Sequence, residues 1–255
     1  MYGMISKTTM KLVIKSVAVA CLLSIILITF SSCAIMPGWI IGSGKVITEP
    51  RDVKYFDRVT LKGSGNLIIE QGDVESLKIE AEDNIIPTIT TEVQRTNLVI
   101  GYEWRFLSGR IPTKPINFYL KVKDIRAITL SGSGTVKSGS LRSEQIDVNI
   151  SGSGKADLNV DVKEINTRIS GSGSVKVIGE TEKQEIVISG SGSYPASGLA
   201  SKECKIVISG SGNCNVRVSD DLDVHISGSG NVFYVGNPMI NQDISGSGKI
   251  NNYSD

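Results

Sequence analysis

The chain has 255 residues, and its 27 Lys and Arg nearly balance its 26 Asp and Glu, so the formal net charge is +1. This balance and the lack of a basic tract in the sequence argue against nucleic-acid binding. With 27 glycines and an aromatic content of 5%, the composition favours one sizeable domain that is rich in turns.

Residues 1–33 look like the signal peptide of a bacterial lipoprotein. Three lysines (Lys7, Lys11 and Lys15) precede an uncharged apolar run from Ser16 to Phe30, and small residues then lead to Cys33. In such signals the cysteine is lipidated and becomes the first residue of the mature chain. Cys21 lies inside the apolar run, too early for that role. We therefore expect an exported protein held by a lipid on Cys33 at the outer membrane or cell surface. An uncleaved membrane anchor is the alternative.

The stretch 34–47 contains Pro37, Gly38, Gly42 and Gly44, and we interpret it as a tether. Residues 48–124 then carry short alternating segments that predict strands with one buried face. These segments are Val59–Leu61, Leu67–Ile69, Leu77–Ala81, Leu98–Phe106 and Ile116–Val122. We interpret this part as a degenerate version of the repeat array that follows it.

Tyr102, Trp104 and Phe106 form the best candidate stripe for contact with a ligand, because aromatic faces can stack on sugar rings. Leu98 and Ile100 continue the same face of the segment, which favours packing over one end of the core. Both interpretations remain open at this point.

Residues 125–252 contain seven copies of Ser-Gly-Ser-Gly, spaced 20, 19, 19, 20, 18 and 18 residues apart. Alternating β-branched residues flank each copy, so one repeat is a strand, a corner and a second strand. A fixed period of this length predicts a solenoid whose repeats bury their apolar faces by stacking. The sequence thus predicts an all-β parallel β-helix. The corners begin with Ser131-Gly132, Ser151-Gly152, Ser170-Gly171, Ser189-Gly190, Ser209-Gly210, Ser227-Gly228 and Ser245-Gly246, and Lys62-Gly63-Ser64-Gly65 is an imperfect eighth copy.

Glycine suits these corners because it adopts positive φ and lets neighbouring backbones approach closely. The serine hydroxyls can cap backbone groups at a corner, and stacked corners would place the first serines about 4.8 Å apart. The alternative is a strip of backbone nests that binds anions. Seven near-identical copies fit a scaffold better than a single site.

The sequence offers little catalytic chemistry. His225 is the only histidine and is expected on the solvent face, so by itself it forms neither a catalytic pair nor a metal cluster. We expect the outward acids to lie at different offsets from the motif, and therefore not to converge as in a glycosidase. These acids are Asp147, Asp157, Asp161, Glu185, Asp221 and Asp223. We predict no catalytic residues, no metal and no cofactor.

Cys204 and Cys214 lie five residues on either side of the corner serine Ser209. An exported protein permits disulfides, but a bridge needs Cα atoms within about 7 Å, and the two arms of a corner are expected to diverge. We favour two buried free thiols over a bridge.

The array, together with Val53-x-x-Phe56-Asp57-x-Val59-x-Leu61 upstream and Glu70-Gln71-Gly72, resembles the head GIN domain family, described as auto-transporter adhesins and common in lipoproteins of Bacteroidetes-type bacteria. The resemblance covers about residues 48–252. It implies a right-handed parallel β-helix and supplies no catalytic or ligand residues.

The function we expect is that of a non-catalytic adhesion or binding module that presents a rigid β-helix surface from the cell envelope. Its partners would be the membrane, through the lipid anchor, and a polysaccharide or an envelope or host protein. A homo-oligomer would cover the last coil, which must be protected against edge-to-edge pairing. The alternatives are a periplasm-facing structural or regulatory protein and, less favoured, a carbohydrate-active β-helix enzyme.

Overall fold

The computed structural model describes residues 40–103 and 109–253. These residues belong to one compact unit, Ile40–Asp255; the other unit, Met1–Trp39, lies outside the described residues. The described part consists of strands and one short 3-10 turn, η1 (Ile86–Thr88). Within it there is no helix that is long and apolar enough to span a membrane. The predicted signal peptide and Cys33 belong to residues 1–39, which lie outside the described part.

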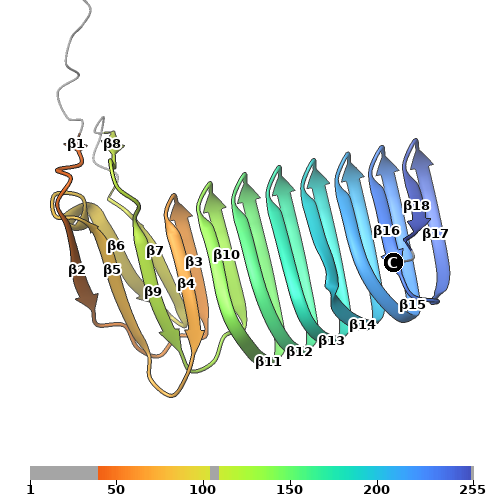
Figure 1. Cartoon of the computed structure of the whole chain (residues 1–255), viewed down its shortest axis with the longest axis horizontal. Coiled ribbons are helices and arrows are strands. Elements are labelled where there is room, and N and C mark those ends of the chain that lie inside the picture. The colour runs from red at the N-terminus through yellow and green to blue at the C-terminus, as the bar shows by residue number, and fades with distance from the viewer. Residues whose placement is uncertain (1–39, 104–108, 254–255) are drawn as a thin grey trace, which may run out of the picture. The chain divides into compact units, whose positions relative to one another are not determined.

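Most of the chain forms a parallel β-solenoid in which each long strand runs from one Ser-Gly-Ser-Gly corner to the next (Figure 1). Each coil has a sharp corner at one end and a rounded bend at the other (Figure 1). The all-β parallel solenoid predicted from the repeats is confirmed. The strands of the array are β10 (Ala127–Gly132), β11 (Thr135–Gly152), β12 (Lys155–Gly171), β13 (Ser174–Gly190), β14 (Ser193–Gly210), β15 (Asn213–Gly228), β16 (Asn231–Val235), β17 (Met239–Gly246) and β18 (Lys249–Asn252).

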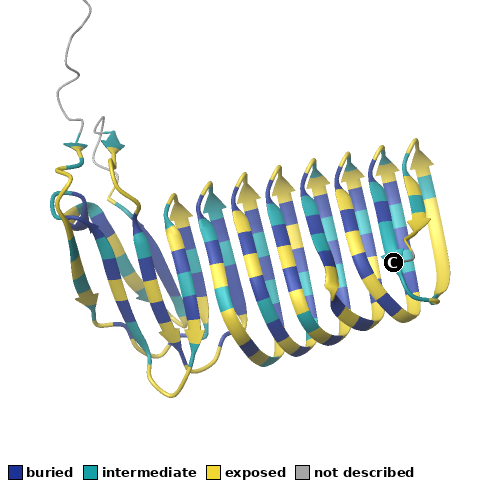
Figure 2. Ribbon diagram, in the orientation of Figure 1, coloured by how far each residue is buried: buried dark blue, intermediate teal, exposed yellow. Residues whose placement is uncertain are grey.

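The core lies between the two faces of the coils and is built by stacking like on like. Ile150, Ile169, Ile188, Ile208 and Ile226 are successive partners in register, and each is at most 2% exposed. Buried and exposed residues alternate along every long strand (Figure 2). The period-two pattern of the sequence is therefore the pattern of inward and outward side chains.

The N-terminal part differs from a simple extension of the array. β3 (Arg58–Gly63) and β4 (Asn66–Gln71) form a coil that pairs in parallel with β10 and β11, and β7 (Asn97–Tyr102) and β9 (Asn117–Val122) stack on it in parallel. In contrast, β2 (Val46–Arg51), β5 (Ser76–Glu82) and β6 (Ile89–Gln94) pair antiparallel. The two residues between β6 and β7 allow only an antiparallel hairpin. These antiparallel pairs end the parallel stack.

The predicted tether 34–47 is partly built into the fold, which corrects that interpretation. β1 (Ile40–Ile41) pairs with β8 (Arg110–Ile111), and Val46 and Ile47 belong to β2. The connecting residues are held by Glu82, which is 1% exposed. Its carboxylate accepts hydrogen bonds from the backbone N–H of Gly44 at 2.7 Å and from the N–H and hydroxyl of Thr113 at 2.8 and 2.5 Å.

We expect Glu82→Gln to weaken the contacts that join Gly44 and Thr113 to the carboxylate of residue 82. Hydrogen bonds to the charged carboxylate, with the Thr113 hydroxyl first, lower the pKa of Glu82. A lowered folded-state pKa stabilises the junction above the unfolded pKa, and this contribution is lost as pH falls through the folded pKa. The protection factors of the Gly44 and Thr113 amides, each measured against the intrinsic exchange rate at the same pH, should therefore fall at acidic pH in the wild type and be low at all pH values in the variant. Equal, pH-independent protection factors in both proteins would contradict this role.

The C-terminal end of the solenoid is not covered by antiparallel strands among the described residues. Within the described residues, β17 pairs only with β15 and β18 only with β16, so the last coil presents free strand edges. Gln242 takes the position that is Val224 in the preceding coil, and Met239 is 73% exposed. A polar residue at an inward position suits a terminal coil that faces water.

Candidate functional site

The corner residues form a continuous structural edge. Gly132, Gly152, Gly171, Gly190, Gly210, Gly228 and Gly246 are partners in register and all have positive φ. The second serine of each copy uses its backbone N–H within the fold, as in the bond from Ser191 to the Gly171 carbonyl at 2.9 Å. Because these N–H groups already have acceptors, the structure disfavours the alternative that the corners are nests for anions.

Tyr102 lies over the first corner rather than on an open surface. Its ring carbon Cε2 would be 3.0 Å from a Cβ at Gly63, and its hydroxyl donates to the Ser64 carbonyl. The guanidinium of Arg110 lies over the ring, with its Cζ 4.6 Å from the ring centroid. Burial raises the pKa of this phenol. Tyr102 therefore packs the corner, while Trp104 and Phe106 lie outside the described residues.

The outward acids are more regular than we predicted. Asp147, Glu185 and Asp223 each precede the first serine of a motif by four residues and fall into one row across the coils. Asn166 and Lys205 occupy the row between them. Two coils separate neighbouring carboxylates by about 9.6 Å, and each interval holds an amide or an ammonium group. The prediction of different offsets was wrong for these three acids, yet their carboxylates stay apart.

His225 lies on the same outer surface, two residues after Asp223 in β15. Its Nε2 lies 3.3 Å from Asp223 Oδ1 and its Nδ1 lies 3.7 Å from Asp243 Oδ2. All three side chains are at least one-third exposed, so solvent screens the pair interactions. Among the described residues, no group of three or more His, Cys, Asp or Glu is arranged to hold a metal ion.

Cys204 and Cys214 are buried free thiols in the structure. Cys214 is the partner in register of Tyr194, and Cys204 lies in the later half of the same strand as Tyr194. Burial raises the pKa of both thiols, which suppresses the reactive thiolate.

Both thiols should therefore not react with an aromatic disulfide reagent in the native protein. After denaturation without reductant, we expect two thiols from Cys204 and Cys214, and one in the control variant Cys204→Ala. A denatured wild-type domain that releases no thiol from these positions would contradict the buried free pair.

The candidate binding site is a pocket near the C-terminal end of the solenoid, and it comes from a change in repeat length. The repeat that starts at Ser189 has 20 residues, whereas the next two have 18. The register between β14 and β15 therefore shifts between Ala196 and Ala200. The extra residues bulge next to β15, where Arg217 Nε donates to the Ser197 carbonyl at 3.1 Å.

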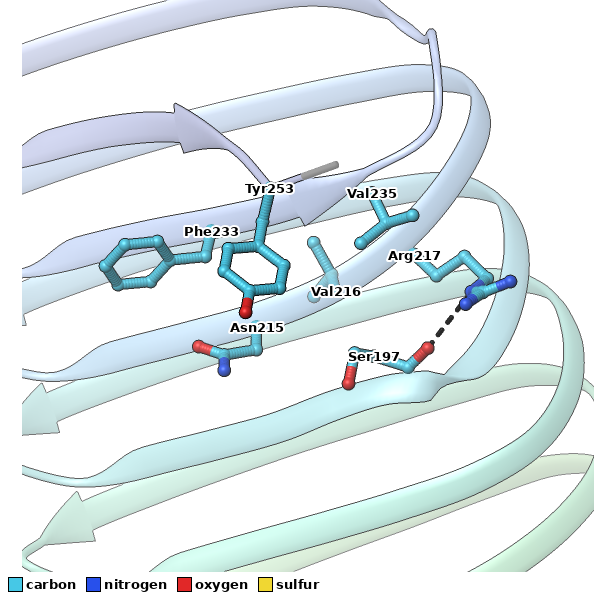
Figure 3. A pocket seen from close by; sticks show the side chains of 7 residues that line it. All are labelled: Ser197, Asn215, Val216, Arg217, Phe233, Val235 and Tyr253. Carbon is cyan, nitrogen blue, oxygen red and sulfur yellow. Dashed lines mark hydrogen bonds between the residues drawn. The ribbon is translucent and has the colours of Figure 1, made fainter. Parts of the chain in front are cut away.

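We call the hollow beside this bulge the β14 pocket; its volume is about 350 Å³. Its lining includes Ser197, Asn215, Arg217, Phe233, Val235 and Tyr253 (Figure 3). Tyr253 is fixed by the bond from its N–H to the Tyr234 carbonyl at 2.7 Å. In Figure 3 the Tyr253 hydroxyl points toward Asn215, and the Phe233 ring extends to the left of the Tyr253 ring.

Sequence reasoning missed this pocket, although two signals were present. The drop from 20 to 18 residues marks the bulge, and Phe233 stands where an outward residue is expected. Nothing in the sequence indicated that Tyr253 returns to β16, because that placement depends on the tertiary structure.

The family model described as "Putative auto-transporter adhesin, head GIN domain" matches residues 55–238. The chain belongs to this family. The resemblance drawn from the repeats is thus confirmed. The family is named for adhesion, not for a reaction, and this points to a surface or envelope protein. None of the curated proteins matches this head GIN sequence significantly.

Solved structures of similar proteins share the fold. A "putative adhesin" from Bacteroides fragilis is 24% identical with a TM-score of 0.79, over 84% of this chain and 100% of that one. A "putative adhesin" from Parabacteroides merdae is 23% identical with a TM-score of 0.65, over 85% and 100% of the chains. A "putative lipid binding protein" from Parabacteroides distasonis is 24% identical with a TM-score of 0.72 over the same shares. At these identities the similarity establishes the solenoid.

Proposed function

We propose that this head GIN protein is a non-catalytic adhesion module of the cell envelope, anchored through a lipid on Cys33. The observation that carries the proposal is the solenoid itself, whose register continues without a break from β10 to β17 at the corners. A stack held by backbone hydrogen bonds at every coil offers a rigid, extended surface. Such a surface suits a polymer or a neighbouring protein.

The outward chemistry also favours binding over catalysis. In the described part, the acidic row alternates with Asn166, Lys205 and Asn241, and Asn241 donates to Asp223 at 3.2 Å. Glycoside hydrolysis by a retaining mechanism needs two carboxyl groups about 5.5 Å apart, much closer than carboxylates two coils apart. An inverting mechanism needs them about 6.5 to 9.5 Å apart with a water between them, and in this row Asn166 or Lys205 occupies the intervening position. The row fits a solvated surface.

The test is the attachment of bacterial cells that express the full chain to wells coated with mucin, a densely glycosylated protein. We expect the wild type to increase retention of cells under flow. The variant Cys33→Ser, which lacks the sulfur that carries the lipid, should not be lipidated and should give no increase. Equal retention with and without the protein would reject adhesion to glycosylated surfaces.

A periplasm-facing structural role is the second candidate. It would leave Cys33→Ser with the same loss of anchoring but give no gain in attachment by the wild type. The two candidates therefore differ in where the solenoid is displayed.

A further inference from the structure

We propose that the β14 pocket is a saccharide-binding site that takes a pyranose ring against Phe233 and Tyr253. The inference rests on the proposed function, because it supplies the adhesion module with a ligand class and a location. Its basis is the combination of one exposed and one partly exposed aromatic ring, side-chain polar groups without a hydrogen-bond partner among the described residues, and a hollow of suitable size.

The aromatic rings are the first step. The corresponding outward positions of the other coils hold Lys137, Asp157 and Lys176 in one run of register and Pro195, Asn215 and Asn251 in the run that contains Phe233. Phe233 points away from the core, whose adjacent inward position is filled by Val232 at 0% exposure. Tyr253 is 62% exposed. Neither ring belongs to the buried core, and a sugar ring can stack its C–H face on an aromatic ring.

The polar groups are the second step. Within the described residues, neither the side-chain amide of Asn215 nor the hydroxyl of Ser197 forms a hydrogen bond. Both groups are therefore available to sugar hydroxyls. Arg217 is held against the bulge through its bond to the Ser197 carbonyl and forms the wall at that side (Figure 3). An aromatic surface with a few convergent polar groups is the usual composition of a small-molecule site.

The size of the hollow is the third step. About 350 Å³ lies at the lower end of the range for ligand sites, about 300 to 1,000 Å³, and is suited to one or two sugar rings. A second pocket of about 320 Å³ contains one aromatic ring, Tyr119, among charged side chains such as Glu80 and Lys121. The Tyr119 hydroxyl already lies 3.4 Å from Glu80 Oε1. Tyr119 is therefore the matched control.

The experiment uses the full chain purified in detergent micelles and applied to a microarray of defined oligosaccharides. Its strongest hits are then titrated by calorimetry. We expect the wild type to bind a subset of saccharides and Phe233→Ala to bind them at least about tenfold more weakly, which corresponds to the loss of one stacking contact of about 1.4 kcal/mol. Tyr119→Ala should keep the wild-type affinity. Since Phe233 lies outside the core, its variant should keep the wild-type melting temperature.

The inference is overturned if the wild type binds no saccharide, if Phe233→Ala binds as tightly as the wild type, or if Tyr119→Ala is the variant that loses binding. The mucin attachment assay separates this failure from failure of the proposed function. Attachment that depends on the protein but not on Phe233 would retain the adhesion module and reject the pocket. Loss of attachment by both wild type and variant would reject adhesion itself.

Discussion

Gly171→Ala should destabilise the solenoid by at least about 3 kcal/mol, or prevent folding, because two effects act together. Gly171 has φ of +113°, a conformation that L side chains rarely adopt. A Cβ at this position would lie 2.7 Å from the Gly152 carbonyl oxygen of the preceding coil. That oxygen belongs to the backbone and accepts the bond from Ser172 N at 3.0 Å, so it has little freedom to move.

The matched control is Gly139→Ala in β11. Gly139 lacks a positive φ, and a Cβ there would have no heavy atom within 4 Å. This change should alter the free energy of unfolding by less than about 1 kcal/mol. Guanidinium denaturation of the two variants measures the difference. Equal stability of Gly171→Ala and Gly139→Ala would show that the corners tolerate side chains and that the glycine row is not the organising feature.

Ile188→Ala should cost about 2 to 5 kcal/mol, the usual range for emptying a buried isoleucine site. Ile188 is fully buried between Ile169 and Ile208. Its Cγ2 also fills the space over Gly212, where a Cβ would approach it to 2.6 Å. The cavity would therefore open in the core and beneath a corner at once.

Ile178→Ala in the same strand is the control, since Ile178 is 44% exposed. We expect a loss below about 1 kcal/mol there. The same denaturation curves provide both values. A similar loss at both positions would mean that the row of stacked isoleucines contributes no more to stability than surface contacts do.

The array could be predicted from the sequence because its spacing and its alternation agree. Once the corner serines are aligned, every residue between them has a fixed partner in the next coil, as Ile169 has Ile188. The same alignment places Asp147, Glu185 and Asp223 in one row, because each lies four residues before a corner serine.

The antiparallel pairs of the N-terminal part and the β14 pocket are not predictable in this way. β2 contains Pro50 and few apolar residues, so its pairing with β5 depends on Glu82 and its partners far along the chain. The pocket depends on where two extra residues bulge and on the return of Tyr253 to β16. Both are tertiary effects, which outweigh local patterns.

The most direct test of a surface-displayed envelope module is the labelling of a single introduced thiol on intact cells. Ser153 lies at an exposed corner, and the native thiols of Cys204 and Cys214 are buried, so Ser153→Cys adds the one reactive sulfur in the described part of the chain. A membrane-impermeant maleimide should label the immunoprecipitated variant on intact cells as strongly as on permeabilised cells, and leave the wild type unlabelled. Labelling only after permeabilisation would place the solenoid in the periplasm and contradict the adhesion account.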